Sequence, residues 1–251
     1  MARRVLDLRI EVAKMDLPFE QFPALSAIGS CRHVFIQRIP GIDVSHDKAE
    51  VLERLDAAHR EIRNATGFGD WPLFTAEQIH GNKIAVIDKV GSALRADRGR
   101  RGAASLAGRE FPACDGIITN QRSVALGIYV ADCCAVYLVD PKTPAIALVH
   151  SGRKGTELGV VTNAIRQMIE RFGSDPANMM VQLSPCIRPP HYEVDFAAEI
   201  VRECRTLGVQ HIHDSGTCTA CDLGRYYSYR AEKGKTGRML AVLGLESTVS
   251  S

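Results

Sequence analysis

Residues 131–155 read ADCCAVYLVDPKTPAIALVHSGRKG, and this stretch decides the fold. Two apolar runs, Ala135–Val139 and Ala145–Val149, flank the segment Asp140–Pro144. That segment is rich in residues that favour turns, and it has a suitable length for a hairpin loop. The stretch therefore predicts a β-hairpin made of two buried strands.

The hairpin brings a cysteine and a histidine together at its open end. We expect Val139 to pair with Ala145. Cys134 then falls opposite His150, and directly opposed side chains have Cβ atoms about 5 Å apart. Strict alternation selects Cys134 and turns Cys133 to the other face. A bulge at the strand start would reverse that choice, so the pattern leaves both cysteines as candidates.

A second histidine, His80, lies outside the hairpin. It stands in Gln78-Ile79-His80-Gly81-Asn82, just before the apolar run Ile84–Ile87. The Gly81-Asn82 pair favours a turn that can project the imidazole. Two histidines and one cysteine are a donor set that holds zinc and leaves the fourth coordination position open. His80, one of the two cysteines and His150 are therefore a candidate metal site.

Apolar periodicity predicts the other elements. The expected helices are Lys48–Asn64, Gly155–Phe172 and Ala197–Leu207, and the expected further strands are Ile84–Ile87, Val124–Val130, Met179–Leu183 and the aromatic run Tyr226–Arg230. Strands and helices mix without a strict βαβ alternation. This favours an α+β fold, with mixed sheets under helical cover, over a doubly wound sheet. We expect one domain over residues 1–251, with the polar stretch Gly91–Arg109 as a long loop within it.

Charge and hydropathy argue against several classes of partner. The chain has 31 basic and 29 acidic residues, a net charge of +2 that gives no reason to expect nucleic acid or membrane binding. The basic cluster Arg95–Arg101 is interpreted as a solvated loop. No run approaches the roughly 20 apolar residues of a membrane span. Asp7, Arg9 and Glu11 interrupt any signal-peptide core, so we expect a cytoplasmic protein with reduced cysteines.

Cys218-Thr219-Ala220-Cys221 forms a second possible metal or redox pair. With Cys204, His211 and His213 nearby, it could bind another zinc ion or act as a redox pair. Cys204, however, lies on the apolar side of an expected helix, and a Cys-x-x-Cys pair alone is a weak signal. We favour a structural role for these cysteines.

Six motifs stand in the order and approximate spacing of one family. They are QIHG (Gln78–Gly81), CDGIIT (Cys114–Thr119), VADCCAVYLVD (Val130–Asp140), HSGRKG (His150–Gly155), SPCI with YEV (Ser184–Ile187 and Tyr192–Val194), and SYR with TGR (Ser228–Arg230 and Thr236–Arg238). From Arg32 to Leu245 the sequence resembles the YfiH/laccase-domain family, also called multicopper polyphenol oxidase-like, peptidoglycan editing factor or purine nucleoside phosphorylase-like. The resemblance implies a layered sandwich of mixed sheets.

The resemblance also implies that His80, Cys133 and His150 bind one zinc ion. It favours Cys133 where the hairpin pattern favours Cys134, so we expect a backbone distortion at Asp132–Cys133. Copper oxidase chemistry is disfavoured, because the chain has only eight histidines and only two of them fall at this site.

The activity implied by the resemblance is on purine nucleosides. It comprises phosphorolysis of adenosine, inosine, guanosine and methylthioadenosine, and deamination of adenosine. Separately, we expect a monomer or homodimer. Zinc lowers the pKa of bound water to about 7, which suits deamination. Phosphorolysis needs a phosphate site, for which Arg38, Lys154 and Arg230 are the candidate cations, and Lys154 stands where a helix start can also favour phosphate. Gln78 and Tyr229 are further candidate substrate contacts.

The sequence departs from the family pattern in HSGRKG and also over Ile36–Ser45, where an aromatic and Thr-Arg before Gly-Gly-Val-Ser are expected, and two alternative functions stay open. Arg153 and Lys154 replace a Trp-Arg pair, and a lysine is a point charge where arginine is a planar fork. One alternative is a cysteine hydrolase for peptidoglycan precursors, with Cys133 as nucleophile and His150 as base. The other is a non-catalytic domain that retains only the metal.

Overall fold

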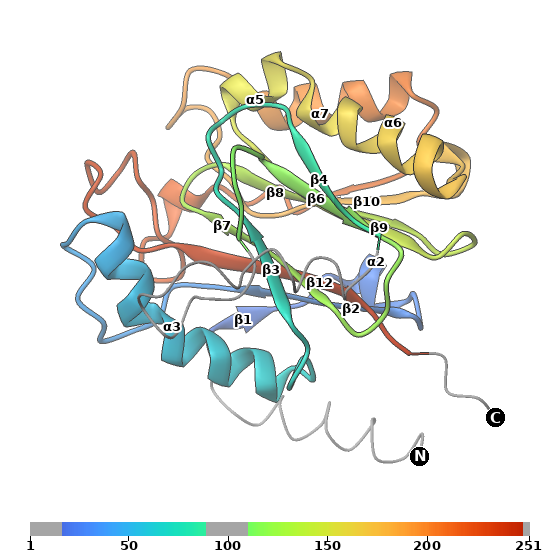
Figure 1. Cartoon of the computed structure of the whole chain (residues 1–251). Helices are drawn as coiled ribbons and strands as arrows, with labels where there is room; N and C mark the ends of the chain where they lie inside the picture. The colour runs from blue at the N-terminus through green and yellow to red at the C-terminus, as the bar shows by residue number, and fades with distance from the viewer. Residues whose placement is uncertain (1–16, 89–109, 248–251) are drawn as a thin grey trace.

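Two six-stranded sheets stack face to face, and helices cover both outer faces (Figure 1). The structure is a computed structural model that describes residues 17–88 and 110–247. The predicted loop Gly91–Arg109 and its basic cluster Arg95–Arg101 therefore lie outside the described residues. Within the described ranges, no helix is long and apolar enough to cross a membrane.

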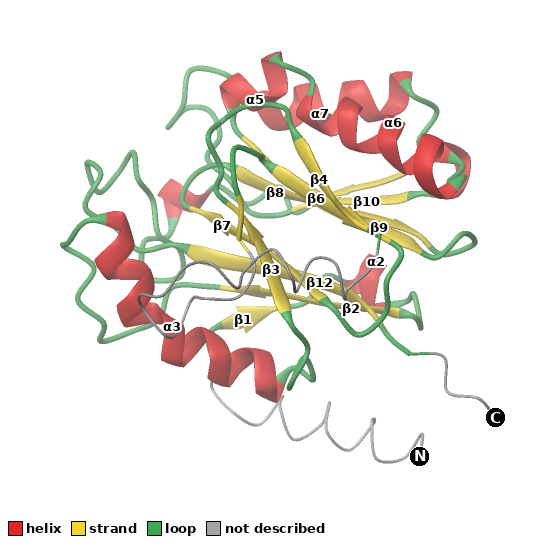
Figure 2. Cartoon of the chain, viewed as in Figure 1, coloured by secondary structure: helices red, strands yellow, loops and turns green. Residues whose placement is uncertain are grey.

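Both sheets are mixed, which confirms the predicted α+β class (Figure 2). The first sheet has the order β1 (Phe19–Glu20), β2 (Cys31–Ile36), β12 (Met239–Leu245), β7 (Ala125–Val130), β3 (Leu73–Ala76) and β5 (Glu110–Phe111). The second has the order β11 (His211–Asp214), β10 (Met180–Leu183), β8 (Cys134–Asp140), β9 (Ala145–Ser151), β6 (Gly116–Thr119) and β4 (Ile84–Ile87). Among the strands of the described residues, only the pairs β3–β7, β3–β5, β4–β6 and β10–β11 are parallel.

The helices form the outer layers of the sandwich. On the side of the first sheet lies α3 (Lys48–Ala65), while α5 (Arg153–Glu157), α6 (Val160–Phe172) and α7 (Phe196–Thr206) cover the second (Figure 1). The short α2 (Pro23–Ser26) is the exception among these helices, because it lies between the two sheets and contacts β2 and β10. The single helix predicted over Gly155–Phe172 is wrong, because Gly159 takes a left-handed conformation with φ +69° and divides it. Leu158, just before this glycine, is 47% exposed.

The hairpin β8–β9 lies at the centre of the molecule and is buried on both faces. Tyr137 and Leu148 belong to the core between the two sheets. Val136 and Val149 belong to the separate core under α6 and α7. A strand with apolar neighbours on both sides needs a continuous apolar run, which is why both runs of residues 131–155 lack polar alternation.

The predicted register of the hairpin is wrong by one residue. Asp140 pairs with Ala145, so the turn contains four residues and not five. The reason is the fully buried Asp140 side chain, which accepts hydrogen bonds from the backbone amides of Lys142 and Thr143 and so belongs to the strand end. A shift of one residue exchanges the faces of a strand, and this matters for the cysteines at its start.

Candidate functional site

The end of the hairpin directs Cys133 and His150 toward the same side. In the observed register Ala135 lies opposite His150, and Cys134 lies opposite Ser151. Cys133, two residues before Ala135, therefore shares the face of His150 without any need for a bulge. Cys134 is fully buried in the core under the helices instead. The pattern-based preference for Cys134 is a consequence of the wrong register.

Backbone features beside these two residues shape the site. The expected distortion before Cys133 is present, because Asp132 has φ +83°. Gly152 leaves space for the thiol, since a Cβ atom there would stand 2.5 Å from the Cys133 sulfur. Asp132 accepts hydrogen bonds from the hydroxyls of Thr219 and Ser228, which fix its unusual conformation.

His80 comes from a loop in a strained conformation. Both Gln78 (φ +64°) and His80 (φ +60°) lie in the left-handed region, which non-glycine residues rarely occupy. The Gln78 side chain holds the loop against β7, because its amide exchanges two hydrogen bonds with the backbone of Tyr129. Backbone strain of this kind is typical of residues whose side chains are held in one direction at a functional site.

Asp115 joins the two histidines. Its carboxylate is fully buried and accepts hydrogen bonds from the backbone amides of His80 (2.8 Å) and Gly81 (2.7 Å). The same group lies 2.9 Å from Nδ1 of His150. Burial alone would raise the pKa of Asp115, but the hydrogen bond from His150 and these backbone amides lower it. With Nδ1 of His150 so occupied, its Nε2 atom is left for Cys133 and for a metal ion.

Donor atoms of His80, Cys133 and His150 all lie within 4.8 Å of one another. The Cys133 sulfur stands 3.9 Å from Nε2 of His80, and the two imidazole rings meet edge to face at 4.8 Å between centroids. His80 is exposed whereas His150 is buried, so the cluster opens on one side. Two imidazoles and a thiolate with one open side fit zinc in a site that can take a further ligand.

Without a metal, Cys133 and His150 form a charged pair. Burial opposes the Cys133 thiolate, but the charge of His150 and hydrogen bonds from both histidines lower the Cys133 pKa to about 6. Burial likewise opposes the His150 cation, but the Cys133 thiolate and the Asp115 carboxylate raise its pKa to about 9. A deprotonated thiol at neutral pH is both a metal ligand and a nucleophile.

A cavity of about 660 Å³ opens beside this cluster. It is large enough for a small-molecule ligand. The charged side chains that line it are five cations and one carboxylate: Lys48, Arg153, Arg230, Lys233, Arg238 and Asp132. Asp132 also accepts a bond from the Arg230 backbone amide, besides its two hydroxyl donors. The cavity wall is therefore strongly positive next to the metal ligands.

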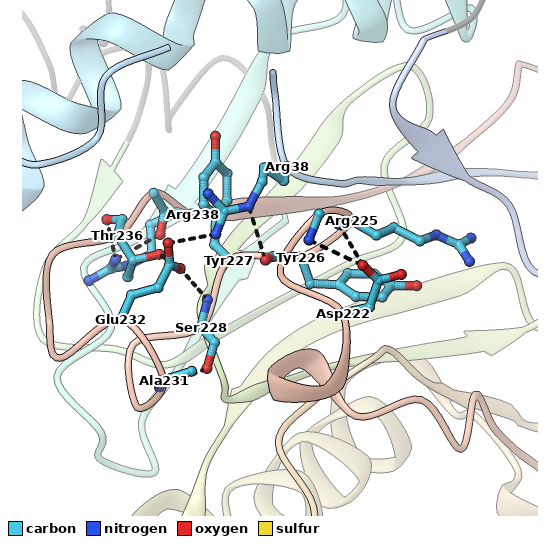
Figure 3. A network of polar contacts seen from close by, with 12 residues as sticks. Arg38, Asp222, Arg225, Tyr226, Tyr227, Ser228, Ala231, Glu232, Thr236 and Arg238 are labelled. Atoms are coloured by element: carbon cyan, nitrogen blue, oxygen red, sulfur yellow. Dashed lines mark hydrogen bonds and ion pairs between the residues drawn. The ribbon is translucent and has the colours of Figure 1, made fainter. Parts of the chain in front are cut away.

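The structure brings some of the sequence-predicted substrate residues to the cavity and excludes others. Gln78, Tyr229 and Arg230 line it, but Arg38 and Lys154 do not. Arg38 forms an ion pair with Glu232 at 2.7 Å and donates to the Tyr226 carbonyl, as Figure 3 shows. It therefore supports the loop behind the cavity.

Lys154 and the aromatic run also differ from expectation. Lys154 is exposed on α5, a helix of only five residues whose start offers little dipole for an anion. The expected strand Tyr226–Arg230 is wrong, since these residues form a coil and turn. Tyr226 and Tyr227 are buried there, whereas the Tyr229 ring is 55% exposed at the cavity.

A family model described as multi-copper polyphenol oxidoreductase laccase matches residues 40–203 and 194–246. The chain belongs to this family. A purine nucleoside phosphorylase of Deinococcus radiodurans is 34% identical over 251 residues, which cover 85% of this chain and 88% of that protein. Purine nucleoside phosphorylase YlmD of Geobacillus stearothermophilus is 27% identical over 254 residues, or 86% of each chain.

The fold is similar to that of a solved structure as well. The crystal structure of YlmD from Geobacillus stearothermophilus matches with a TM-score of 0.74 at 23% sequence identity. The match covers 92% of this chain and 100% of the other. At that identity the likeness shows the fold alone.

Sequence reasoning missed three residues of this laccase-family site. Asp115 and Arg238 lie inside the CDGIIT and TGR motifs, but nothing in the sequence alone links them to the histidines. Lys48 begins a charged helix, and the sequence pattern there indicates an ordinary surface residue. Arg153, which replaces the family tryptophan, adds a cation to the cavity wall, paired with Glu157 at 3.0 Å.

Replacing Asp115 with asparagine should weaken metal binding about 10- to 100-fold, because it removes the negative charge beside His150 and leaves only one oxygen to accept from the backbone amides and the imidazole. Zinc titration against a competing chelator measures this. Asp140→Asn is the matched control, since Asp140 is an equally buried carboxylate at the far end of the same hairpin. Equal zinc affinity in Asp115→Asn and wild type would contradict the orienting role.

Proposed function

We propose that this protein is a zinc-dependent purine nucleoside phosphorylase that also deaminates adenosine. The observation that carries the proposal is the position of the His80–Cys133–His150 cluster at the wall of a cationic cavity. Relatives named purine nucleoside phosphorylases at 27% and 34% identity support it. Proposed substrates are adenosine, inosine, guanosine and methylthioadenosine, with phosphate as the second substrate.

The donor set favours one zinc ion over several coppers, despite the family description. Within the described residues, two His/Cys groups have metal-binding geometry, and the one at the cavity supplies only two imidazoles and a thiolate. Multicopper oxidases need many imidazole ligands for several ions. Zinc suits two imidazoles and one thiolate, and when bound it supplies a Lewis acid with an open coordination position.

Arg238 and Lys48 are the proposed phosphate ligands. Burial lowers the pKa of Lys48, and the positive charge of Arg238 lowers it further. Burial also lowers the pKa of Arg238. Among the described residues no carboxylate forms an ion pair with either cation. Two repelling cations on one cavity wall are stabilised by an anion bound between them.

The remaining cavity residues suit a nucleoside. Tyr229 presents an exposed ring on which a purine can stack, as aromatic rings do with bases. Asp132 already accepts three hydrogen bonds, so its role is to hold the loop that carries Arg230. In phosphorolysis an oxygen of the bound phosphate forms a bond to ribose C1′ while the bond from C1′ to the purine nitrogen breaks. The base leaves with the bonding electrons and takes up a proton.

One observation favours a second function, cysteine hydrolysis. The Cys133 pKa of about 6 gives a thiolate beside His150, which is the arrangement of a nucleophile and its base. Zinc binding and cysteine hydrolysis both use the Cys133 thiolate. Because bound zinc occupies that thiolate, its reactivity separates the two functions experimentally. The cytoplasmic location and the monomeric or dimeric state stay predictions.

Adenosine and phosphate should give adenine and ribose 1-phosphate with the zinc-loaded protein, measured by chromatography. Arg238→Gln should raise the KM for phosphate about tenfold or more, because it removes a charged hydrogen-bond donor. Lys154→Gln is the matched control, since that lysine lies outside the cavity. His150→Ala should lose both zinc and turnover. Full phosphorolysis by a zinc-free His150→Ala protein would contradict the proposal.

Thiol alkylation separates the zinc enzyme from the hydrolase. In chelator-treated protein, Cys133 should react with iodoacetamide with a midpoint near pH 6, because the thiolate forms above its lowered pKa. Bound zinc should protect it at every pH. Peptide mass mapping distinguishes Cys133 from the exposed Cys221. Equal labelling of Cys133 before and after chelation would favour the hydrolase.

A further inference from the structure

A second group of metal-type donors lies outside the catalytic cluster. The donor atoms of His191, Cys218 and Cys221 all lie within 4.8 Å of one another. Nδ1 of His191 stands 3.7 Å from the Cys218 sulfur and 3.5 Å from the Cys221 sulfur. All three residues are at least partly exposed, so an ion can reach them from solvent.

These distances fit a tetrahedral zinc site. Zinc binds thiolate at about 2.3 Å and imidazole at about 2.0–2.1 Å, which places ligand nitrogen and sulfur about 3.6 Å apart at the tetrahedral angle. Both observed nitrogen–sulfur distances lie within about 0.1 Å of that value. The Cys-x-x-Cys spacing of Cys218 and Cys221 is common in structural zinc sites, and two thiolates with one imidazole are soft donors that select zinc over magnesium or calcium.

The backbone already holds these donors in place. The amide of Thr219 donates to the Cys186 carbonyl, and the amide of Cys186 donates to the Thr217 carbonyl. His191 closes a turn by donating its amide to the Arg188 carbonyl at 2.9 Å. The donors thus converge from two segments whose backbones are joined before any ion binds, which reduces the entropy lost on binding.

Both segments also carry walls of the substrate cavity. Tyr192, next to His191, and Ile187 line the cavity from one segment. From the other, Thr219 donates its hydroxyl to Asp132, the residue that precedes the Cys133 ligand. An ion that ties His191 to the Cys-x-x-Cys pair would therefore fix these two walls relative to each other.

We propose that His191, Cys218 and Cys221 bind a second zinc ion, which clamps the two segments at the cavity rim. Its fourth position faces solvent and takes water. This replaces the structural role favoured from sequence for Cys218 and Cys221. The other residues considered with them do not take part: Cys204 is fully buried on α7, and His211 and His213 on β11 stand outside the group.

Zinc stoichiometry of the full chain tests the proposal. Protein purified with a thiol reductant, loaded with zinc and freed of excess should hold two ions per chain. Cys221→Ser and His191→Ala should each hold one, and so should His150→Ala, which loses the catalytic ion. His213→Ala is the matched control and should hold two, with circular dichroism confirming that every variant is folded.

Cobalt(II) gives an independent readout without activity. In Cys133→Ser, the thiolate-to-cobalt absorption band should persist, because two thiolates of the second site remain, and it should vanish in Cys133→Ser/Cys221→Ser. One zinc per chain in wild type, lost in His150→Ala and unchanged in Cys221→Ser, would overturn the second site while leaving the proposed function intact. A Cys218–Cys221 disulfide in the reductant-purified protein would overturn it too.

Discussion

The buried carboxylate of Asp115 is the interaction on which the site depends. It receives the backbone amides of the His80 loop and the imidazole of His150, which come from segments about 70 residues apart in sequence. The backbone carbonyl of Asp115 also accepts a hydrogen bond from the His150 amide at 2.7 Å, so β6 and β9 are joined at the same point. A carboxylate can stay ionised without solvent only when donors surround it. Those donors are what bring the two histidines together.

The sandwich explains why this site can be both strained and stable. The hairpin β8–β9 is covered on both faces, which fixes the direction of Cys133 and His150 by packing. The position of the strained loop at His80 comes from Asp115 and from the Gln78 contact with β7. Strand β9 thus positions His150, the bend that leads into β8 positions Cys133, and an anchored loop positions His80.

Sequence was sufficient for the parts of this structure that depend on local pattern. Apolar runs identified β4, β8 and β9, and helical spacing identified α3 and α7, because burial imposes those patterns directly. The register failed at Asp140, a polar residue whose burial depends on its own turn. The cations Lys48 and Arg238 were missed for a related reason. Their proposed role depends on a cavity that is formed by segments distant in sequence. The local sequence around either residue does not indicate that cavity.

The central claim is that one zinc ion is held by one thiolate and two imidazoles at the cavity wall. Zinc-edge X-ray absorption on Cys221→Ser protein, in which only this site should be loaded, tests it most directly. The account predicts one sulfur at about 2.3 Å and nitrogen or oxygen ligands at about 2.0–2.1 Å. A first shell without sulfur, or with two sulfurs, would contradict it.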